Sequence, residues 1–302
     1  MATKKSASTA KKSTAKKSSS AAAKTKSTKT VKKPTTTTVV KTAPTPPPTA
    51  ARKRFNFSRA PLLAASMAEF IGTFLLAAIV LVTGNTSILI LFALITIVLA
   101  IGAISGAHVN PAITIGAWVT RRIKATRAIS YIIAQVLGAV LALVVVNGFV
   151  MGAPEPAVDQ QQAFGQQPAA SAQVFKISEI LADKEWYFLA AELIGTAIFA
   201  FGVASTTLER NRMAAAFTVG GSLFLGLTIT GYLTGAITGI VAQGGIGPAV
   251  LNPAAAAAVQ GISWSVWPIA VYALAPVIGG VLGFALRDLL RDEGEITVSS
   301  AK

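Results

Sequence analysis

Asn110-Pro111-Ala112 and Asn252-Pro253-Ala254 are two copies of one tripeptide, 142 residues apart, and both lie in strongly apolar surroundings. Two long hydrophobic stretches precede each copy, and a third follows it. A tripeptide that recurs once carries little information by itself. Its recurrence at the same place in two similar sets of segments indicates an internally duplicated membrane unit with its functional centre at the tripeptides.

The composition indicates a membrane protein. The 302 residues are 53% hydrophobic and only 13% charged, about half the charged content of an ordinary soluble domain. Residues 71–120 contain no Lys, Arg, Asp or Glu, and such runs are long enough for helices of about 20 residues that cross a bilayer. We predict an all-α membrane protein with six transmembrane helices, over residues 62–84, 87–105, 127–150, 186–208, 213–235 and 266–287.

The segments that follow the tripeptides, 110–123 and 252 to about 262, are too short to cross a bilayer, because ten helical residues span only about 15 Å. Pro loses no hydrogen bond at the first helical position, and Asn directly before it is a good N-cap. Each tripeptide therefore predicts a re-entrant half-helix that reaches the middle of the membrane. The sequence AEFIGT at 68–73 also matches AELIGT at 191–196. Three crossings per unit give the units opposite orientations, so we predict two inverted repeats.

The positive charge is concentrated in the first 59 residues, which hold 16 Lys and Arg and no Asp or Glu. Their Lys/Ser/Thr/Ala/Pro composition predicts a disordered tail. Its role stays open between a solvated tail that sets topology, attraction to anionic lipid and non-specific binding of nucleic acid. We predict this tail at residues 1–59, a membrane domain at 60–291 and a short tail at 292–302.

The remaining basic clusters fall on one side of the membrane if six helices alternate. By the positive-inside rule this side is the cytoplasm, so both termini are predicted to be cytoplasmic. The clusters consist of Arg121, Arg122, Lys124, Arg127, Arg210, Arg212, Arg287 and Arg291.

Two helix starts that meet at mid-membrane direct two positive dipole ends at one point. Asn110 and Asn252 would then offer side-chain amides as donors. Such an arrangement passes neutral polar molecules and opposes cations and protons. The irregular backbone before each start would line a wet cavity and supply carbonyl acceptors, from Gly106, Ala107, His108, Val109, Ala249, Val250 and Leu251.

Glu69 and Glu192 are intramembrane carboxylates at equivalent places in the repeat. We expect them to accept hydrogen bonds from backbone N–H groups of the re-entrant loops, with proton relay as the alternative. His108, the only His, is expected to pack at the pore wall, with a pH gate as the alternative. The chain has no Cys and no clustered carboxylates, so we expect no metal ion, cofactor or catalytic residue.

The motifs resemble those of a known family. Ser105–Gly116, SGAHVNPAITIG, resembles the first signature of the aquaporin, or major intrinsic protein, family. Residues 68–73, 131–135 and 276–280 are similar to its helix signatures, and the resemblance covers roughly residues 62–290. It implies the aquaporin-like fold, a water-type pore with Asn110 and Asn252 as central donors, and a homotetramer with one pore per subunit.

The chain departs from the family pattern at the pore constriction. The family usually has Arg directly after the second tripeptide, and its glycerol channels have Arg-Asp, whereas this chain has Ala255 and another Ala. The other constriction positions, carried over from the family by counting from the motifs, fall on Ile90, Ala249 and, on the fifth helix, Leu233, with Tyr232 as the alternative. The resemblance therefore implies an apolar, wider mouth with weaker cation exclusion.

We expect a passive channel, not an enzyme, for water or small uncharged solutes in the plasma membrane. One alternative is a glycerol- or ammonia-type facilitator with little water transport. Another is a membrane-anchored interaction protein whose basic tail binds anionic lipid or nucleic acid. A secondary transporter fits less well, because only Glu69 and Glu192 could supply paired ionisable groups at a central site.

Overall fold

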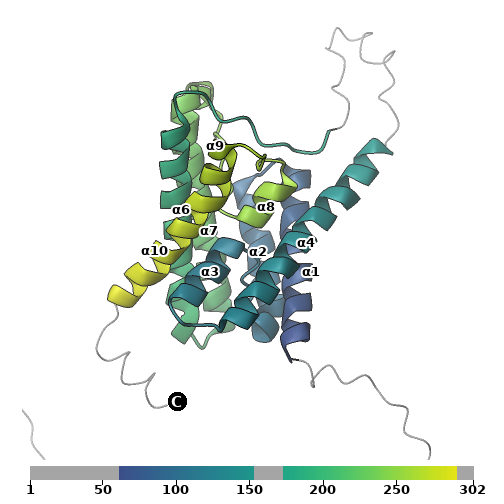
Figure 1. Ribbon diagram of the computed structural model, residues 1–302, viewed down its shortest axis with the longest axis vertical. Helices are drawn as coiled ribbons and strands as arrows, with labels where there is room; N and C mark the ends of the chain where they lie inside the picture. Colours follow the sequence, from purple (N-terminus) through teal and green to yellow (C-terminus); the bar gives the residue numbers. More distant parts are fainter. Residues whose placement is uncertain (1–60, 153–172, 291–302) are drawn as a thin grey trace, which may run out of the picture. The chain divides into compact units, whose positions relative to one another are not determined.

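The computed structural model describes residues 61–152 and 173–290, and within these ranges every regular element is helical. The predicted tails at 1–59 and 292–302 lie outside the described residues, as does most of the 151–185 loop. The helices (Figure 1) are α1 (Pro61–Thr83), α2 (Ser87–Ser105), α3 (Pro111–Val119), α4 (Ala125–Met151), α6 (Glu185–Ser205), α7 (Arg212–Thr238), α8 (Pro253–Ala258), α9 (Val266–Ile269) and α10 (Ala275–Leu289).

Six helical stretches in the described part of the chain are long and apolar enough to cross a membrane: α1, α2, α4, α6, α7 and the run Val266–Leu289 from α9 through α10. This confirms the predicted number of spans, and their ends lie within about three residues of the predicted ranges. Span α2 has a mean hydropathy of 2.9, yet only 22% of it is buried. Its outward side chains, such as Phe92, are apolar as well, and a helix that is apolar on all sides suits lipid rather than water.

The two repeats use the same packing. Helix α1 packs on α4 in the first repeat, and α6 packs on α10 in the second. Glycines allow both contacts, because a Cβ at Gly138 would lie 2.4 Å from the Phe70 carbonyl oxygen, and one at Gly279 would lie 2.4 Å from that of Leu193. Close backbone approach at small residues is typical of helices in membranes.

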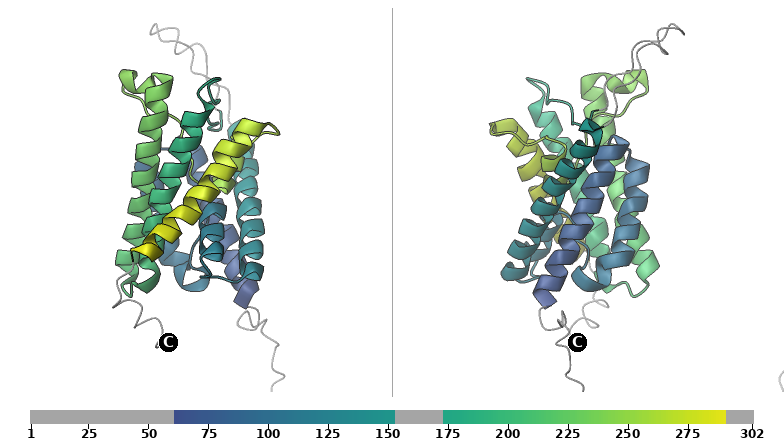
Figure 2. Two further views of the ribbon diagram at one scale, coloured as in Figure 1. Left: turned by 60° about the vertical axis from the view of Figure 1, so that its left-hand side comes forward. Right: turned by 90° about the vertical axis from the view of Figure 1, so that its right-hand side faces the viewer.

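The half-helices α3 and α8 lie among the long helices (Figures 1 and 2), and each packs on a long helix of the other repeat, α3 on α10 and α8 on α4. Both are shorter than the predicted 110–123 and 252–262. The chain leaves the helix soon after each end, because Arg121 and Gln260 adopt left-handed backbone angles, with φ of 63° and 56°. The N–H groups of Arg122 and Gly261 then bond back to the carbonyls of Ala117 and Ala256 and close the two ends.

Candidate functional site

Glu69, on α1, contacts the backbone directly before the first tripeptide. Its Oε1 accepts a hydrogen bond from the N–H of His108 at 3.0 Å, and its Oε2 accepts one from the N–H of Val109 at 2.7 Å. Gln135, on α4, donates from Nε2 to the same Oε2 at 2.8 Å. Val109 has a φ of 42°, a region that β-branched residues avoid. A fully buried carboxylate therefore holds a strained backbone in place.

Glu192, on α6, makes the equivalent contacts in the second repeat. Its carboxylate accepts hydrogen bonds from the N–H groups of Val250 at 2.7 Å and Leu251 at 2.8 Å. Leu251 is also strained, with a φ of 57°. Within the described ranges no side chain donates to Glu192 as Gln135 does to Glu69. The second loop is therefore held by two hydrogen bonds, without the extra support that the first receives.

Asn110 and Asn252 both cap the half-helices and join them. The Oδ1 of Asn110 accepts from the N–H of Ala112 at 2.8 Å, and Pro111 and Pro253 are the first residues of their helices. The Nδ2 of Asn110 donates to the carbonyl of Leu251 at 2.8 Å, and that of Asn252 donates to the carbonyl of Val109 at 2.9 Å. A carboxamide has two N–H donors, so each Asn keeps one for another partner.

A narrow cavity of about 20 Å³ adjoins both Asn side chains. It lies toward the end of the bundle that carries the α1–α2 turn, which we call the Asn85 face. Among the described residues, the polar side chains on its wall are those of Asn85, Asn110 and Asn252. The other lining residues are apolar: Leu76, Val80, Ile90, Val109, Phe199, Leu223, Leu227, Val250 and Ala255.

The backbone carbonyls before the tripeptides divide into two groups. Those of Val109 and Leu251 accept the Asn amides, and that of Ala249 accepts from the Nδ2 of Asn85 at 2.6 Å. No protein group in the described part of the chain donates to the carbonyls of the remaining four, Gly106, Ala107, His108 and Val250. These four oxygens are the acceptors that remain for another molecule.

Three of the four predicted constriction residues lie near this cavity. Ile90 and Ala255 line it. Ala249 lies beside a second, larger cavity on the Asn85 face, which is also lined by Asn85 and Leu227. Ile90 and Ala255 thus share one cavity wall, and Ala249 lies beside the adjoining cavity.

Leu233, the position predicted on the fifth helix, does not line this cavity. Leu233 is 40% exposed and Tyr232 is 59% exposed, and neither lines the cavity, whereas Leu227 does and is only 2% exposed. Helix α7 continues to Thr238, beyond the cavity, and the chain then turns back. On the way back the N–H of Gly247 bonds to the carbonyl of Gly231 at 2.8 Å. The count backward from the second tripeptide did not allow for the length of this excursion. The predicted Leu233 therefore falls later in α7 than Leu227, which lines the cavity.

Sequence reasoning also missed two equivalent residues on the cavity wall. Leu76 and Phe199 both line the cavity, and each lies seven residues, two helical turns, after the carboxylate of its repeat, Glu69 or Glu192. The duplicated AEFIGT and AELIGT segments were therefore sufficient to find them. Asn85 was missed because it lies in a turn outside every motif.

His108 is tied to its surroundings. Its Nδ1 lies 3.2 Å from the Oγ1 of Thr114, and its ring meets that of Tyr131 edge to face, with centroids 5.5 Å apart. It is not among the residues that line the cavity. The ring thus makes polar and aromatic contacts with α3 and α4.

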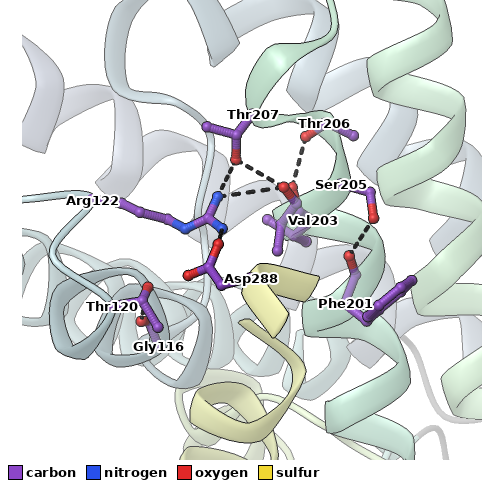
Figure 3. Close-up of polar contacts among 10 residues, drawn as sticks. Gly116, Thr120, Arg122, Phe201, Val203, Ser205, Thr206, Thr207 and Asp288 are labelled. Atoms are coloured by element: carbon purple, nitrogen blue, oxygen red, sulfur yellow. Dashed lines mark hydrogen bonds and ion pairs between the residues drawn. The ribbon is translucent and has the colours of Figure 1, made fainter. Parts of the chain in front are cut away.

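At the opposite end of the bundle, the Arg122 face, one arginine joins three parts of the chain (Figure 3). Its guanidinium pairs with Asp288 on α10, with 2.6 Å between Nη2 and Oδ1. It also donates to the carbonyl of Ala204 at 3.3 Å and to the hydroxyl of Thr207, in the connection from α6 to α7. Arg122 itself lies in the turn from α3 to α4, so it ties the first half-helix to the second repeat.

Comparisons with known proteins agree with this arrangement. The chain is 45% identical over 92 residues to the glycerol uptake facilitator protein-like 6 of Lactiplantibacillus plantarum, an alignment of 28% of this chain and 43% of that protein. It is 28% identical over 202 residues to aquaporin Z of Photorhabdus laumondii, covering 65% of this chain and 78% of that protein. The X-ray structure of the aquaglyceroporin from Plasmodium falciparum matches with a TM-score of 0.52 and 20% identity, over 76% of this chain and 96% of that one, which supports the fold.

Six membrane-spanning helices with two inward half-helices, each started by Asn-Pro-Ala, define a membrane channel of inverted repeats. The sequence model of the major intrinsic protein family matches residues 56–286. The chain therefore belongs to the major intrinsic protein family, whose members are channels and not enzymes.

Proposed function

We propose that this channel conducts water and small uncharged solutes along a path between the starts of α3 and α8. The observation that carries the proposal is the pair Asn110 and Asn252, each with one amide hydrogen left over beside a cavity whose other walls are almost entirely apolar. A solute that enters such a narrow apolar space loses most of its water. The two amides then replace part of that hydration, together with Val250, the one residue with an unoccupied loop carbonyl that is among the described residues lining this cavity.

The same arrangement opposes cations. Each half-helix directs its positive end, equivalent to roughly half an elementary charge, at the middle of the path. Glu69 and Glu192 serve as loop supports in this proposal, because both carboxylates are fully buried and are occupied by backbone N–H groups. Both carboxylates thereby interact with the loops rather than with a passing ion.

A second candidate is a facilitator for glycerol or ammonia with little water transport. It is favoured by the apolar constriction, where Ile90, Leu227 and Ala255 carry no charge. The relative named as a glycerol uptake facilitator-like protein is consistent with this candidate. The two candidates share one pore and differ in the ratio of solute to water permeability.

We further propose a plasma-membrane location with the Arg122 face and both termini in the cytoplasm. Arg121, Lys124 and Arg127 lie on the α3–α4 side of the bundle near the start of α1, as the positive-inside rule requires. A homotetramer would cover part of the exposed apolar surface of the spans, and lipid would cover the rest. The basic tail, which we predict to contact anionic lipid or nucleic acid in the alternative function, lies outside the described residues.

Stopped-flow light scattering of proteoliposomes tests the function. Vesicles with the protein should shrink faster than empty vesicles under an osmotic gradient, or take up glycerol, urea or ammonia faster. Equal rates for all four would overturn the proposal.

A matched pair of variants tests the path. Leu227→Ala enlarges the cavity and should raise solute uptake. Leu233→Ala removes the same atoms from an exposed position on the same helix and should leave solute uptake unchanged. If the two variants behave alike, the cavity is not the conducting path.

A further inference from the structure

We propose that Asn85 is a specificity-determining residue of this pore and selects small neutral solutes that can both donate and accept a hydrogen bond. This inference rests on the proposed function. Asn85 lies in the α1–α2 turn and lines the cavity beside the two tripeptide Asn residues. Within residues 61–152 and 173–290, it is the one polar side chain on that wall besides Asn110 and Asn252.

Its position is at the junction of two cavities. The second cavity, of about 450 Å³, lies on the Asn85 face, and its lining residues come from the α1–α2 turn and the start of α2, from the segment before α6, from α7 and from residues 246–249. Asn85 and Leu227 are the two residues that line both cavities. A solute that moves from the larger cavity into the smaller one therefore passes between an amide and an apolar side chain.

The backbone and the amide of Asn85 are both fixed. The residue has a φ of 62°, a conformation that Asn tolerates better than most residues. Its N–H bonds to the carbonyl of Val80 at 3.1 Å, and its Nδ2 donates to the carbonyl of Ala249 at 2.6 Å. No partner for its second amide hydrogen or for its Oδ1 occurs among the described residues. One donor and one acceptor are thus held at the junction and remain available.

The free amide hydrogen and the Oδ1 of Asn85 matter because the side chains around them are apolar. Ile90 and Ala255, which line the same cavity, offer no hydrogen bond, and the carbonyl of Ala249 is already taken by Asn85 itself. Of the two described residues that line both cavities, only Asn85 can offer a hydrogen bond from its side chain to a solute that sheds water there, since Leu227 is apolar. Because the amide is neutral, it offers this bond without adding a charge to the passage.

Two substitutions and one control test the proposal in proteoliposomes. Asn85→Gly removes the amide but keeps a residue that accepts a φ of 62°, so folding is expected to be retained. Asn85→Asp keeps the size but replaces the donor with a carboxylate. Asn147→Asp makes the same change at an exposed position near the end of α4 that lines neither cavity. Osmotic water permeability and the uptake of glycerol and urea are measured at equal protein density, after size-exclusion chromatography confirms assembly.

We expect both Asn85→Gly and Asn85→Asp to lower the permeability to glycerol and urea relative to water, because each variant removes the amide donor that these solutes would bind at the junction. Each change should be about 2- to 10-fold, the effect of losing roughly one hydrogen bond, and Asn147→Asp should match wild type. Wild-type ratios in both Asn85 variants, or equal shifts in Asn85→Asp and Asn147→Asp, would overturn the proposal. If Asn85→Asp does not assemble, the Asn85→Gly result decides alone. Wild-type vesicles no faster than empty ones would instead overturn the proposed function, and this inference with it.

Discussion

Replacement of Glu192 with Gln would show whether a buried carboxylate holds the second re-entrant loop. Glu192 is 1% exposed and accepts hydrogen bonds from the N–H groups of Val250 and Leu251. Gln has nearly the same size but keeps only one acceptor oxygen. Its NH₂ group would face one of the two loop N–H groups, so that one buried donor would lose its partner.

The expected loss follows from these two bonds. A hydrogen bond to a charged group contributes about 1.5–3 kcal/mol, a neutral one about 1 kcal/mol, and a buried donor without a partner costs about 1–3 kcal/mol. Together these terms give a loss of about 3 kcal/mol, which lowers the ratio of docked to displaced loop by on the order of 100-fold. Glu69→Gln should leave its loop better supported than Glu192→Gln does, because the remaining oxygen can still accept from both Val109 and Gln135, whereas Glu192→Gln would keep one of two bonds.

The assays are thermal unfolding in detergent and water permeability in proteoliposomes. Glu192→Gln should lower both the unfolding midpoint and the permeability. Glu185→Gln is the control, because Glu185 begins the same helix and no hydrogen bond joins it to the loop. A Glu192→Gln protein with wild-type values in both assays would refute the loop-support argument. Normal water permeability with a loss of proton flux would instead support the proton-relay alternative.

Three further predictions concern other parts of the chain. Ala255→Arg should lower glycerol uptake relative to water, because residue 255 lines the cavity; unchanged uptake in vesicles would show that this side chain does not reach the constriction. Arg122→Ala should lower stability by roughly 1 kcal/mol, since its ion pair with Asp288 is partly exposed and screened by salt. Unfolding midpoints at low and high salt, compared with those of Asp288→Asn, measure this contribution, and a larger loss at high salt would contradict it. Mercurials should not block the pore by thiol capture, because the chain has no Cys; a block that added thiol reverses would contradict this.

The spans and the half-helix starts could be predicted because their signals are local. Length and apolar composition decide whether a helix crosses a membrane, and the cap of a helix depends on a few adjacent residues. Asn110 and Asn252 are accordingly N-caps with Pro at the next position. The ends of α3 and α8 were predicted too late, because the left-handed Arg121 and Gln260 that close them carry no Gly or Pro signal.

The residues of the cavity wall could be predicted only in part, because they come from segments far apart in the chain. Ile90 and Ala255 lie at fixed distances from a tripeptide and were found by counting. Leu227 is separated from the second tripeptide by the excursion through residues 239–248, whose length no local pattern reveals. Asn85 reaches the site through a hydrogen bond to a residue 164 positions away, and only the tertiary fold brings these two residues together.

Under the proposed function, ion selectivity resides at one level of the conducting path. The cavity wall carries no charged side chain, and the field of a helix end declines within about one turn. Under the proposed function, cation exclusion therefore depends on the starts of α3 and α8 and on the loops that position them. The second loop rests on two hydrogen bonds to Glu192 without a counterpart of Gln135. An equal weakening of the loop hydrogen bonds at Glu192 and at Glu69 should therefore cause more cation leak in the Glu192 case, next to α8.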